Sequence, residues 1–315
     1  MEMSKKKVIF FQTKIISMKL FTKGILLLFI LPVVLNCSQK NNIQPDYDTV
    51  QDSTSILFSV NGLSDPEAVR YDESQDVYFI SNWDGNGGDQ DSNGFISKVD
   101  SKGNIIDLRF MVGTDELPMH APRGMYIENG SLWVADVTGV HVFDTKTGSQ
   151  QKFIDFSSFE PGFLNDVSGD GSGSIYVTDT GKPIVYKIED DKASVFLDSL
   201  PIYPNGITYD STNNFFVLAP WRRDTTFYSF NVSGEISSHF TFQGGNFDGI
   251  EFIEGNLLAA SQVDESIRIH DGTSNKILIH TLGRPADIGI DRTNKVIAVP
   301  YIALDKVDFW GFQKK

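Results

Sequence analysis

Short apolar runs alternate with polar turns through most of the chain after residue 56. The runs are rich in Val, Ile, Phe, Tyr and Trp, as in residues 77–80, 132–135 and 175–178. Asp, Asn, Gly and Ser fill the turns between them, as in residues 169–171. β-Branched and aromatic runs with such punctuation are typical of β-strands, and no stretch has helical periodicity. The pattern therefore predicts an all-β fold.

A tetrad of residues recurs ahead of these strands: a turn residue, a polar or charged residue, a small residue and an aliphatic residue. Its copies are Pro66-Glu67-Ala68-Val69, Pro122-Arg123-Gly124-Met125, Leu164-Asn165-Asp166-Val167, Pro204-Asn205-Gly206-Ile207, Phe247-Asp248-Gly249-Ile250 and Pro285-Ala286-Asp287-Ile288. Most copies lie about 40 residues apart, a period typical of repeat architectures. Three further strands follow most copies, so the six copies predict a six-bladed β-propeller.

The two ends of the repeat array complete each other. The last repeat stops after its third strand, at residues 307–312, whereas residues 56–60 precede the first tetrad as a fourth strand would. We expect the N-terminal strand to complete the last blade, because this closes the ring and removes an exposed sheet edge. A pair of β-sandwiches is the alternative fold, but it leaves the regular tetrads unexplained.

The N-terminus has a different pattern. Several lysines precede an apolar run of 11 residues, 25–35, and Cys37, the only cysteine, follows it. The run is too short to span a membrane comfortably, but it has the length of a signal-peptide core. Residues 1–36 resemble a bacterial lipoprotein signal peptide, with Cys37 as the lipidation site, although Asn36 stands where a small residue is usual. An uncleaved membrane anchor is the alternative.

This organisation predicts a flexible tether at residues 37–55 and a propeller at residues 56–315. We expect a lipid-anchored protein of the bacterial cell envelope, periplasmic or surface-facing, that contacts the membrane only through its lipid. The polar composition of residues 38–55 supports the tether, because such a segment has too little apolar surface to form a core.

The composition excludes several kinds of partner and site. The 315 residues include 27 Lys and Arg against 41 Asp and Glu, which gives a net charge of −14. Phosphate would repel such a chain, so we expect no nucleic-acid partner. A single cysteine excludes an intrachain disulfide framework and a cysteine-rich zinc site. We expect a monomer that acts on a small molecule.

The second tetrad positions form a ring in a propeller, because the first strand of every blade lines the central channel. They hold Glu67, Arg123, Asn165, Asn205, Asp248 and Ala286. Carboxylate and amide oxygens suit Ca²⁺, and the absence of His and Cys argues against zinc or copper. The predicted metal ligands are therefore Glu67, Asn165, Asn205 and Asp248. Alternatively, these side chains only satisfy backbone groups of the turns.

These tetrads resemble those of the SMP-30/gluconolactonase/LRE-like family and, more remotely, of the paraoxonases. The resemblance covers about residues 56–312 and is carried by Pro66-Glu67, Asn165-Asp166, Pro204-Asn205-Gly206 and Phe247-Asp248-Gly249. It implies one catalytic divalent metal, with Ca²⁺ expected and Zn²⁺, Mg²⁺ or Mn²⁺ as alternatives. Its ligands would be Glu67, Asn205 and Asp248, with Asn165 as a ligand or a substrate contact. Phe163 departs from the Arg of many gluconolactonases, and Arg123 from the His of paraoxonase-like members.

The resemblance implies hydrolysis of lactones or related esters, with the metal polarising the carbonyl group. Either Asp248 or His120 would take a proton from the attacking water, although His120 could also be an ordinary loop histidine. Arg123 would bind an anionic substrate group or a ring carboxylate. The expected substrate contacts are Asn165, Arg123, Trp83, Trp221, Arg222 and Tyr301. For each aromatic residue the alternative is packing between blades.

Two other functions fit the same fold. One is a non-catalytic, envelope-anchored propeller that binds a ligand or a protein partner, and the other is a strictosidine-synthase-like enzyme. A second motif is also ambiguous, because residues 89–100 have the spacing of an EF-hand Ca²⁺ loop. Their second half overlaps a predicted strand, so an ordinary glycine-rich turn is the alternative.

Overall fold

The computed structural model describes residues 53–313 of the chain. The predicted signal peptide, Cys37 and most of the predicted tether lie outside the described residues. Within the described part, no helix has the length and apolar character needed to cross a membrane. Its only helical elements are two single turns of 3-10 helix, η1 (Ser157–Phe159) and η2 (Ile302–Leu304).

Each of the first three blades is one antiparallel sheet of consecutive strands. Blade 1 comprises β2 (Pro66–Asp72), β3 (Val77–Asn82), β4 (Phe95–Asp100) and β5 (Ile105–Val112). Blade 2 comprises β6 (Met125–Glu128), β7 (Ser131–Ala135), β8 (Gly139–Asp144) and β9 (Gln150–Asp155). Blade 3 comprises β10 (Leu164–Gly169), β11 (Ile175–Asp179), β12 (Ile184–Glu189) and β13 (Lys192–Leu197).

The other three blades follow the same order, except that the last one borrows a strand. Blade 4 comprises β14 (Pro204–Asp210), β15 (Phe215–Pro220), β16 (Thr226–Phe230) and β17 (Ile236–Thr241). Blade 5 comprises β18 (Phe247–Ile253), β19 (Asn256–Ser261), β20 (Ser266–His270) and β21 (Asn275–His280). Blade 6 comprises β22 (Gly289–Asp291), β23 (Val296–Tyr301), β24 (Lys306–Gln313) and β1 (Ser53–Asn61).

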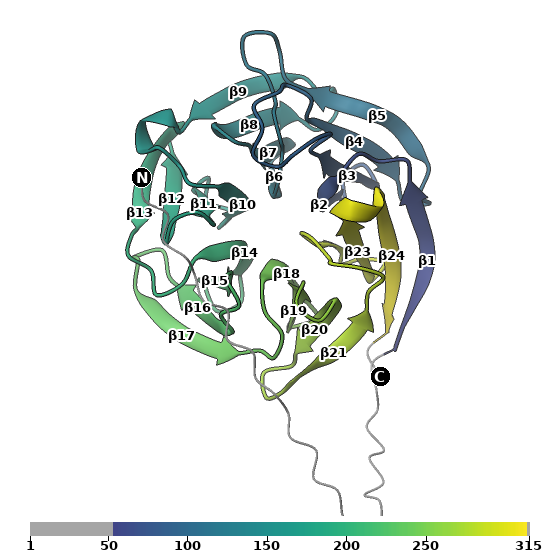
Figure 1. Ribbon diagram of the computed structural model, residues 1–315, viewed down its shortest axis with the longest axis vertical. Coiled ribbons are helices and arrows are strands. Elements are labelled where there is room, and N and C mark those ends of the chain that lie inside the picture. The colour runs from purple at the N-terminus through teal and green to yellow at the C-terminus, as the bar shows by residue number, and fades with distance from the viewer. Residues whose placement is uncertain (1–52, 314–315) are drawn as a thin grey trace, which may run out of the picture. The chain divides into compact units, whose positions relative to one another are not determined.

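The blades are arranged around a central axis, with the first strand of each blade innermost (Figure 1). Neighbouring inner strands contact one another, as β10 does β14 and β14 does β18. The six-bladed β-propeller predicted from the tetrads is therefore confirmed. In this propeller all six inner strands begin at the same end of the channel.

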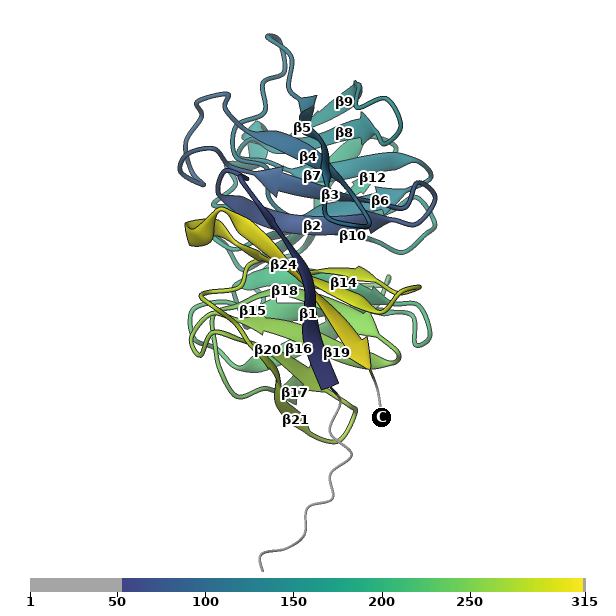
Figure 2. The same cartoon turned by 90° about the vertical axis from the view of Figure 1, so that its right-hand side faces the viewer.

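Closure of the ring also follows the prediction. β1 runs antiparallel beside β24, with Asn61 opposite Lys306, and the two strands lie side by side in both views (Figures 1 and 2). The N-terminal strand thus completes the last blade. However, β1 begins at Ser53, inside the segment predicted as tether, because Ser53 and Thr54 pair with Gln313 and Phe312.

The hydrophobic core is divided among the blade interfaces. Each cluster of buried apolar side chains joins two neighbouring blades, and together the clusters cover every interface around the ring. Aromatic pairs bridge several of them, such as Tyr176 with Phe216 at 4.4 Å between ring centroids. This packing fixes the blades against one another and holds the inner strands around the channel.

Candidate functional site

Four inner strands share an irregularity at their first residues. In β2, Pro66 pairs with Asn82 and Val69 with Ile80, so three steps along β2 face two along β3. Such an extra residue is a β-bulge, which interrupts the pairing and redirects a side chain. Equivalent shifts occur between Leu164 and Val167, Pro204 and Ile207, and Phe247 and Ile250. Each bulge contains a second tetrad position, and these positions hold the predicted metal ligands.

The bulges border one cavity of about 500 Å³ at the starts of the inner strands. Glu67, Asn165, Asn205 and Asp248 all line it, one each from β2, β10, β14 and β18. The structure therefore brings the four predicted ligands together from four blades. The other two ring residues, Arg123 and Ala286, are not among its lining residues.

Each of the four ligand candidates has a buried oxygen without a hydrogen-bond donor. These atoms are Glu67 Oε2, Asn165 Oδ1, Asn205 Oδ1 and Asp248 Oδ1. The four residues are only 2–4% exposed. Leaving a buried polar atom unpaired costs about 1–3 kcal/mol, and native proteins rarely do so without a reason. Four such acceptors around one cavity fit a bound cation with oxygen ligands.

The electrostatics of the two carboxylates agree with this fit. Burial, and then the neighbouring Asp248, Asp287 and Asp166, raise the pKa of Glu67 well above its usual range. Burial and Asp287 raise the pKa of Asp248 to about 8, against hydrogen bonds from Gln262 and Asn205. Both acids are therefore held in an environment that disfavours negative charge, and a cation would relieve it.

The chemistry of the donor set favours one kind of ion. In residues 53–313, no three side chains of the His, Cys, Asp and Glu types are grouped as metal ligands. The set instead combines two carboxylates with two amides, so half of the oxygens offered to a cation are neutral. Ca²⁺ accepts carboxylate and amide oxygens in flexible geometry, whereas Zn²⁺ prefers nitrogen and sulfur.

The walls of the cavity are largely apolar. Trp83, Phe163, Trp221 and Ile302 line it, and Thr180, Arg222 and Gln262 supply the nearby polar groups. Arg222 also lies over the ring of Tyr203, with 3.4 Å from its Cζ to the ring centroid. Of the predicted substrate contacts, Trp83, Trp221, Arg222 and Asn165 thus line the cavity.

Tyr301 does not line the cavity, contrary to the prediction. Its side chain is 1% exposed and packs in the hydrophobic cluster between blades 5 and 6. Ile302, the first residue of η2, lines the cavity instead. Tyr301 is the last residue of β23, where the strand places its side chain in the interblade core, whereas Ile302 belongs to the turn that follows.

Arg123 lies behind the cavity wall. Its guanidinium stacks on Phe163, with 3.7 Å from Cζ to the ring centroid, and donates to the carbonyl oxygens of Leu164 and Gly87. It does not donate to a ring carboxylate, one of its two predicted roles, although its charge acts on Glu67. Burial lowers the pKa of Arg123 to about 10, so it stays protonated at neutral pH.

His120 is also placed differently from the prediction. It is 9% exposed and absent from the lining of the cavity. Its Nδ1 accepts a hydrogen bond from the Ser92 backbone N–H, while its own backbone N–H donates to Asp136. His120 therefore ties two loops together, and Asp248 is the remaining candidate for the proton acceptor.

Residues 89–100 do not wrap as an EF-hand loop. The second half of the motif is the extended strand β4, which pairs with β3. Asp100 accepts hydrogen bonds from the turn that follows, at Lys102 and Asn104. An extended strand advances about 3.3 Å per residue, so Asp100 is carried away from Asp89. The glycine-rich turn is the interpretation that fits.

Sequence reasoning missed a second layer of charge in the channel. Asp166 and Asp287 occupy third tetrad positions, where the pattern otherwise has Ala or Gly, and both contact Arg70. The departure from a small residue was the available signal. Thr180 and Ile302 were also missed, and they carry no comparable signal.

Comparisons with known proteins were made for the whole chain. No family model and no curated protein matches it. Among solved structures, it is similar to a gluconolactonase of Xanthomonas campestris, with 13% identity, a TM-score of 0.63 and coverage of 83% of this chain and 90% of that one. A putative gluconolactonase has 14% identity, a TM-score of 0.61 and coverages of 84% and 92%.

Propellers of other function are similar as well. Virginiamycin B lyase of Staphylococcus aureus has 13% identity, a TM-score of 0.58 and coverages of 82% and 99%. At such identities the similarity establishes the propeller fold, and the residues of the site must carry any argument about activity.

Proposed function

We propose that this protein is a metal-dependent hydrolase of lactones or related esters. The observation that carries the proposal is the group of four unpaired oxygens, from four blades, around one cavity with aromatic walls. The similarity to two gluconolactonase structures supports the same reaction class.

In this proposal Glu67, Asn165, Asn205 and Asp248 hold one divalent cation, with Ca²⁺ as the expected ion. When bound, the ion would polarise the substrate carbonyl and stabilise negative charge on its oxygen. Gln262 Nε2 donates to Asp248 Oδ2 at 2.6 Å, which fixes the carboxylate and leaves Oδ1 unpaired. We assign Asp248 as the acceptor of the proton from the attacking water, and the proton then passes to the leaving alkoxide.

The walls suggest what surrounds the reacting bond. Trp83, Phe163 and Trp221 offer apolar faces, and Phe163 is held in place by the stacked Arg123. We therefore propose a substrate with an apolar body rather than a densely hydroxylated sugar lactone. Excluding water from such a pocket also strengthens electrostatic interactions in it.

The test is a hydrolysis assay on the purified protein with aliphatic lactones, sugar lactones and aryl esters. We expect turnover of the apolar lactones or esters, loss of turnover with chelator, and recovery with added Ca²⁺. Metal analysis should give one divalent ion per chain. Absence of both a bound ion and turnover would refute the proposal.

A non-catalytic role at the cell envelope is the second candidate, because a chain of a nidogen/laminin complex has a similar fold, with a TM-score of 0.54 and 13% identity. Tight binding of Ca²⁺ without any turnover would favour it. In either case we propose that Cys37 carries a lipid anchor. Cys37→Ala should then move the protein from the membrane fraction to the soluble fraction.

A further inference from the structure

Glu67, Asn165, Asn205 and Asp248 are called the ligand ring below. Next to this ring, the channel holds a buried guanidinium between two buried acids. Arg70 Nη2 lies 3.1 Å from Asp166 Oδ1 and 2.8 Å from Asp287 Oδ2. The two aspartates come from blades 3 and 6, which stand on opposite sides of a six-bladed ring. Their side chains are each 1% exposed and that of Arg70 is 10% exposed. One arginine thus bridges the channel.

The remaining partners of Arg70 are oxygens too. Its Nη1 donates to the backbone carbonyls of Val69, at 2.8 Å, and Ile288, at 3.2 Å. The guanidinium is therefore surrounded by carboxylate and carbonyl oxygens from three blades. This is the donor set from which proteins build Ca²⁺ sites. Asp287 Oδ1 adds a further buried oxygen that lacks a donor.

The neighbouring blades leave room for the two acids. A Cβ on Gly124 would lie 2.2 Å from Asp166 Oδ1, and a Cβ on Gly249 would lie 2.1 Å from Asp287 Oδ1. Contacts this short do not occur with real side chains, so both positions require glycine. The acids therefore occupy space that adjacent inner strands keep free.

The charges along this part of the channel balance around one divalent ion. The ionisable groups counted are Glu67, Asp166, Asp248 and Asp287 with Arg70 and Arg123; Glu251 lies 4.0 Å from Arg70 as well, but its charge is balanced by Arg292. When all are ionised, the four carboxylates exceed the two guanidiniums by two charges, which one divalent cation would cancel. Without Arg70, the excess would be three negative charges, more than one divalent cation cancels.

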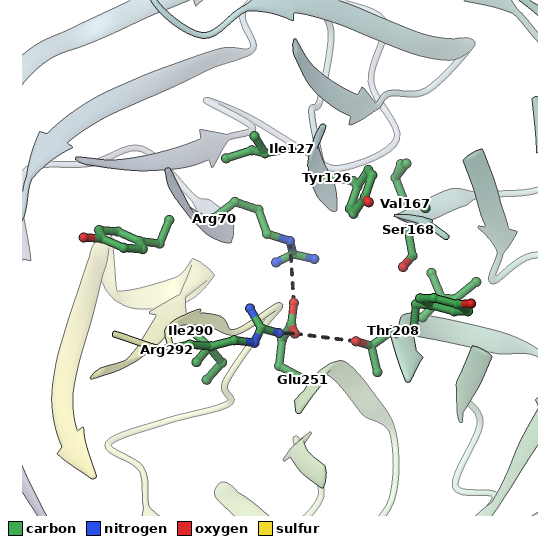
Figure 3. Close-up of a pocket in the computed structure, with 13 residues that line it drawn as sticks. Arg70, Tyr126, Ile127, Val167, Ser168, Thr208, Glu251, Ile290 and Arg292 are labelled. Atoms are coloured by element: carbon green, nitrogen blue, oxygen red, sulfur yellow. Dashed lines mark hydrogen bonds and ion pairs between the residues drawn. The ribbon is translucent and has the colours of Figure 1, made fainter. Parts of the chain in front are cut away.

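Arg70 also lines a second cavity in this part of the propeller. This cavity of about 230 Å³ is lined by the distal parts of the inner strands, including Tyr126, Ser168 and Thr208 (Figure 3). Arg70 points into this cavity toward Glu251, which Arg292 neutralises at 2.6 Å (Figure 3). Arg70 lines this second cavity and is not among the residues that line the cavity at the ring.

We propose that Arg70 is a built-in cation of the propeller, occupying the place between Asp166 and Asp287 where a second divalent ion would otherwise bind. It thereby limits the channel to the single ion of the ligand ring. The inference rests on the proposed function only in assigning that one ion to the ring.

The test counts bound ions in the full chain after dialysis against about 10 mM CaCl₂, about ten times the Kd of the weakest extracellular sites. Arg70→Met keeps the length of the side chain but removes its charge, and it should raise the count by one ion per chain. Arg70→Lys should leave the count unchanged. The matched control is Arg292→Met, which removes an exposed guanidinium beside Glu251 and should also leave it unchanged.

The site of the extra ion is tested by combining Arg70→Met with Asp287→Asn, which should abolish the gain. A folded Arg70→Met protein that binds the same number of ions as the wild type would overturn the proposal. If Arg70→Met is unfolded without metal, Ca²⁺ should restore its circular dichroism spectrum, and failure to do so would equally overturn it. A wild type without any ion refutes the proposed function, yet a gain of one ion in Arg70→Met would still support the role of Arg70.

Discussion

Two groups of buried carboxylates in this propeller behave in opposite ways. At the ends of the second strands in blades 2 and 3, Asp136 and Asp179 accept hydrogen bonds from backbone N–H groups of neighbouring loops. Asp179 receives four of them, from Gly162, Phe163, Gly181 and Lys182. In the ligand ring, Glu67 and Asp248 each keep a buried oxygen without a donor.

The contrast separates acids whose oxygens are satisfied by backbone N–H groups from acids that keep an unpaired oxygen. Hydrogen bonds from His141, His120 and Val137 lower the pKa of Asp136 despite its burial. In the ring, burial and neighbouring acids raise the pKa of Glu67 and Asp248 instead. Burial alone therefore does not distinguish the two groups, whereas hydrogen-bond satisfaction does.

The largest expected effect is on activity in the ring. Asp248→Asn should reduce hydrolysis by about 100-fold or more, because it removes a charged ligand and the proton acceptor. The same variant should make the metal-free protein more stable at neutral pH, because Asp248, with its raised pKa, loses a proton on unfolding and an asparagine does not. Steady-state kinetics and urea unfolding measure the two effects. Wild-type activity in Asp248→Asn would show that the unpaired acids of the ring differ from the loop acids in no way that matters for hydrolysis.

The loop carboxylates should show the reverse behaviour. Asp179→Ala should lower the free energy of unfolding by about 2–4 kcal/mol, because several backbone N–H groups lose a charged acceptor. Urea denaturation measures this. The control is Asp191→Ala, which removes an exposed ion pair with Lys152 and should change stability by less than about 1 kcal/mol.

The response to pH sharpens the comparison. In the metal-free protein, Asp248 keeps its proton up to a pH of about 8, whereas in the unfolded chain it loses it near a pH of about 4. The folded state therefore binds more protons in this window, and stability should fall as pH rises through it. Asp136 has the opposite sign, because its lowered pKa makes stability fall as pH drops below about 4.

Thermal melts at a series of pH values can separate the effect of Asp248 from that of Asp136. Asp248→Asn should reduce the loss of stability as pH rises toward 8. Asp136→Asn should reduce the loss of stability as pH falls below about 4. Ca²⁺ at about 100 times its Kd should add about 2.7 kcal/mol of stability, and its effect should grow with pH because protons compete for the ring. A metal-free melting temperature that rises from pH 5 to pH 8 would contradict the assignment.

The smallest expected effect concerns the wall of the cavity. Phe163→Leu removes the ring on which Arg123 stacks, an interaction worth about 0.5–2 kcal/mol. We expect KM for apolar substrates to rise several-fold with little change in kcat, because the wall contacts substrate and transition state alike. A loss confined to kcat would instead indicate that Phe163 acts on the reacting groups.

Much of the architecture could be predicted because it is periodic. The recurrence of the tetrads located the inner strands, and the unmatched strands at residues 56–60 and 307–312 predicted the closure that β1 and β24 show. The same register placed Glu67, Asn165, Asn205 and Asp248 at one depth. Their convergence on one cavity follows from this equivalence, whereas their role as ligands remains a prediction.

The remaining features depend on contacts between distant residues. The bulges cannot be recognised from spacing, because they depend on how the first two strands of a blade pair. The bridge of Arg70 between Asp166 and Asp287 requires strands from different blades to be in place. His120 and Tyr301 were assigned to the cavity from their position near strand ends. Loop hydrogen bonds and interblade packing direct them elsewhere.

The sequence by itself thus determined the number of blades, their closure and the ring of oxygen-bearing residues, because a repeated pattern of apolar strands has few ways to bury its faces. Only the tertiary structure decided which buried acids are satisfied and which are left unpaired. The physical reason is that hydrogen-bond satisfaction depends on backbone groups and side chains far away along the chain, and no local pattern records them.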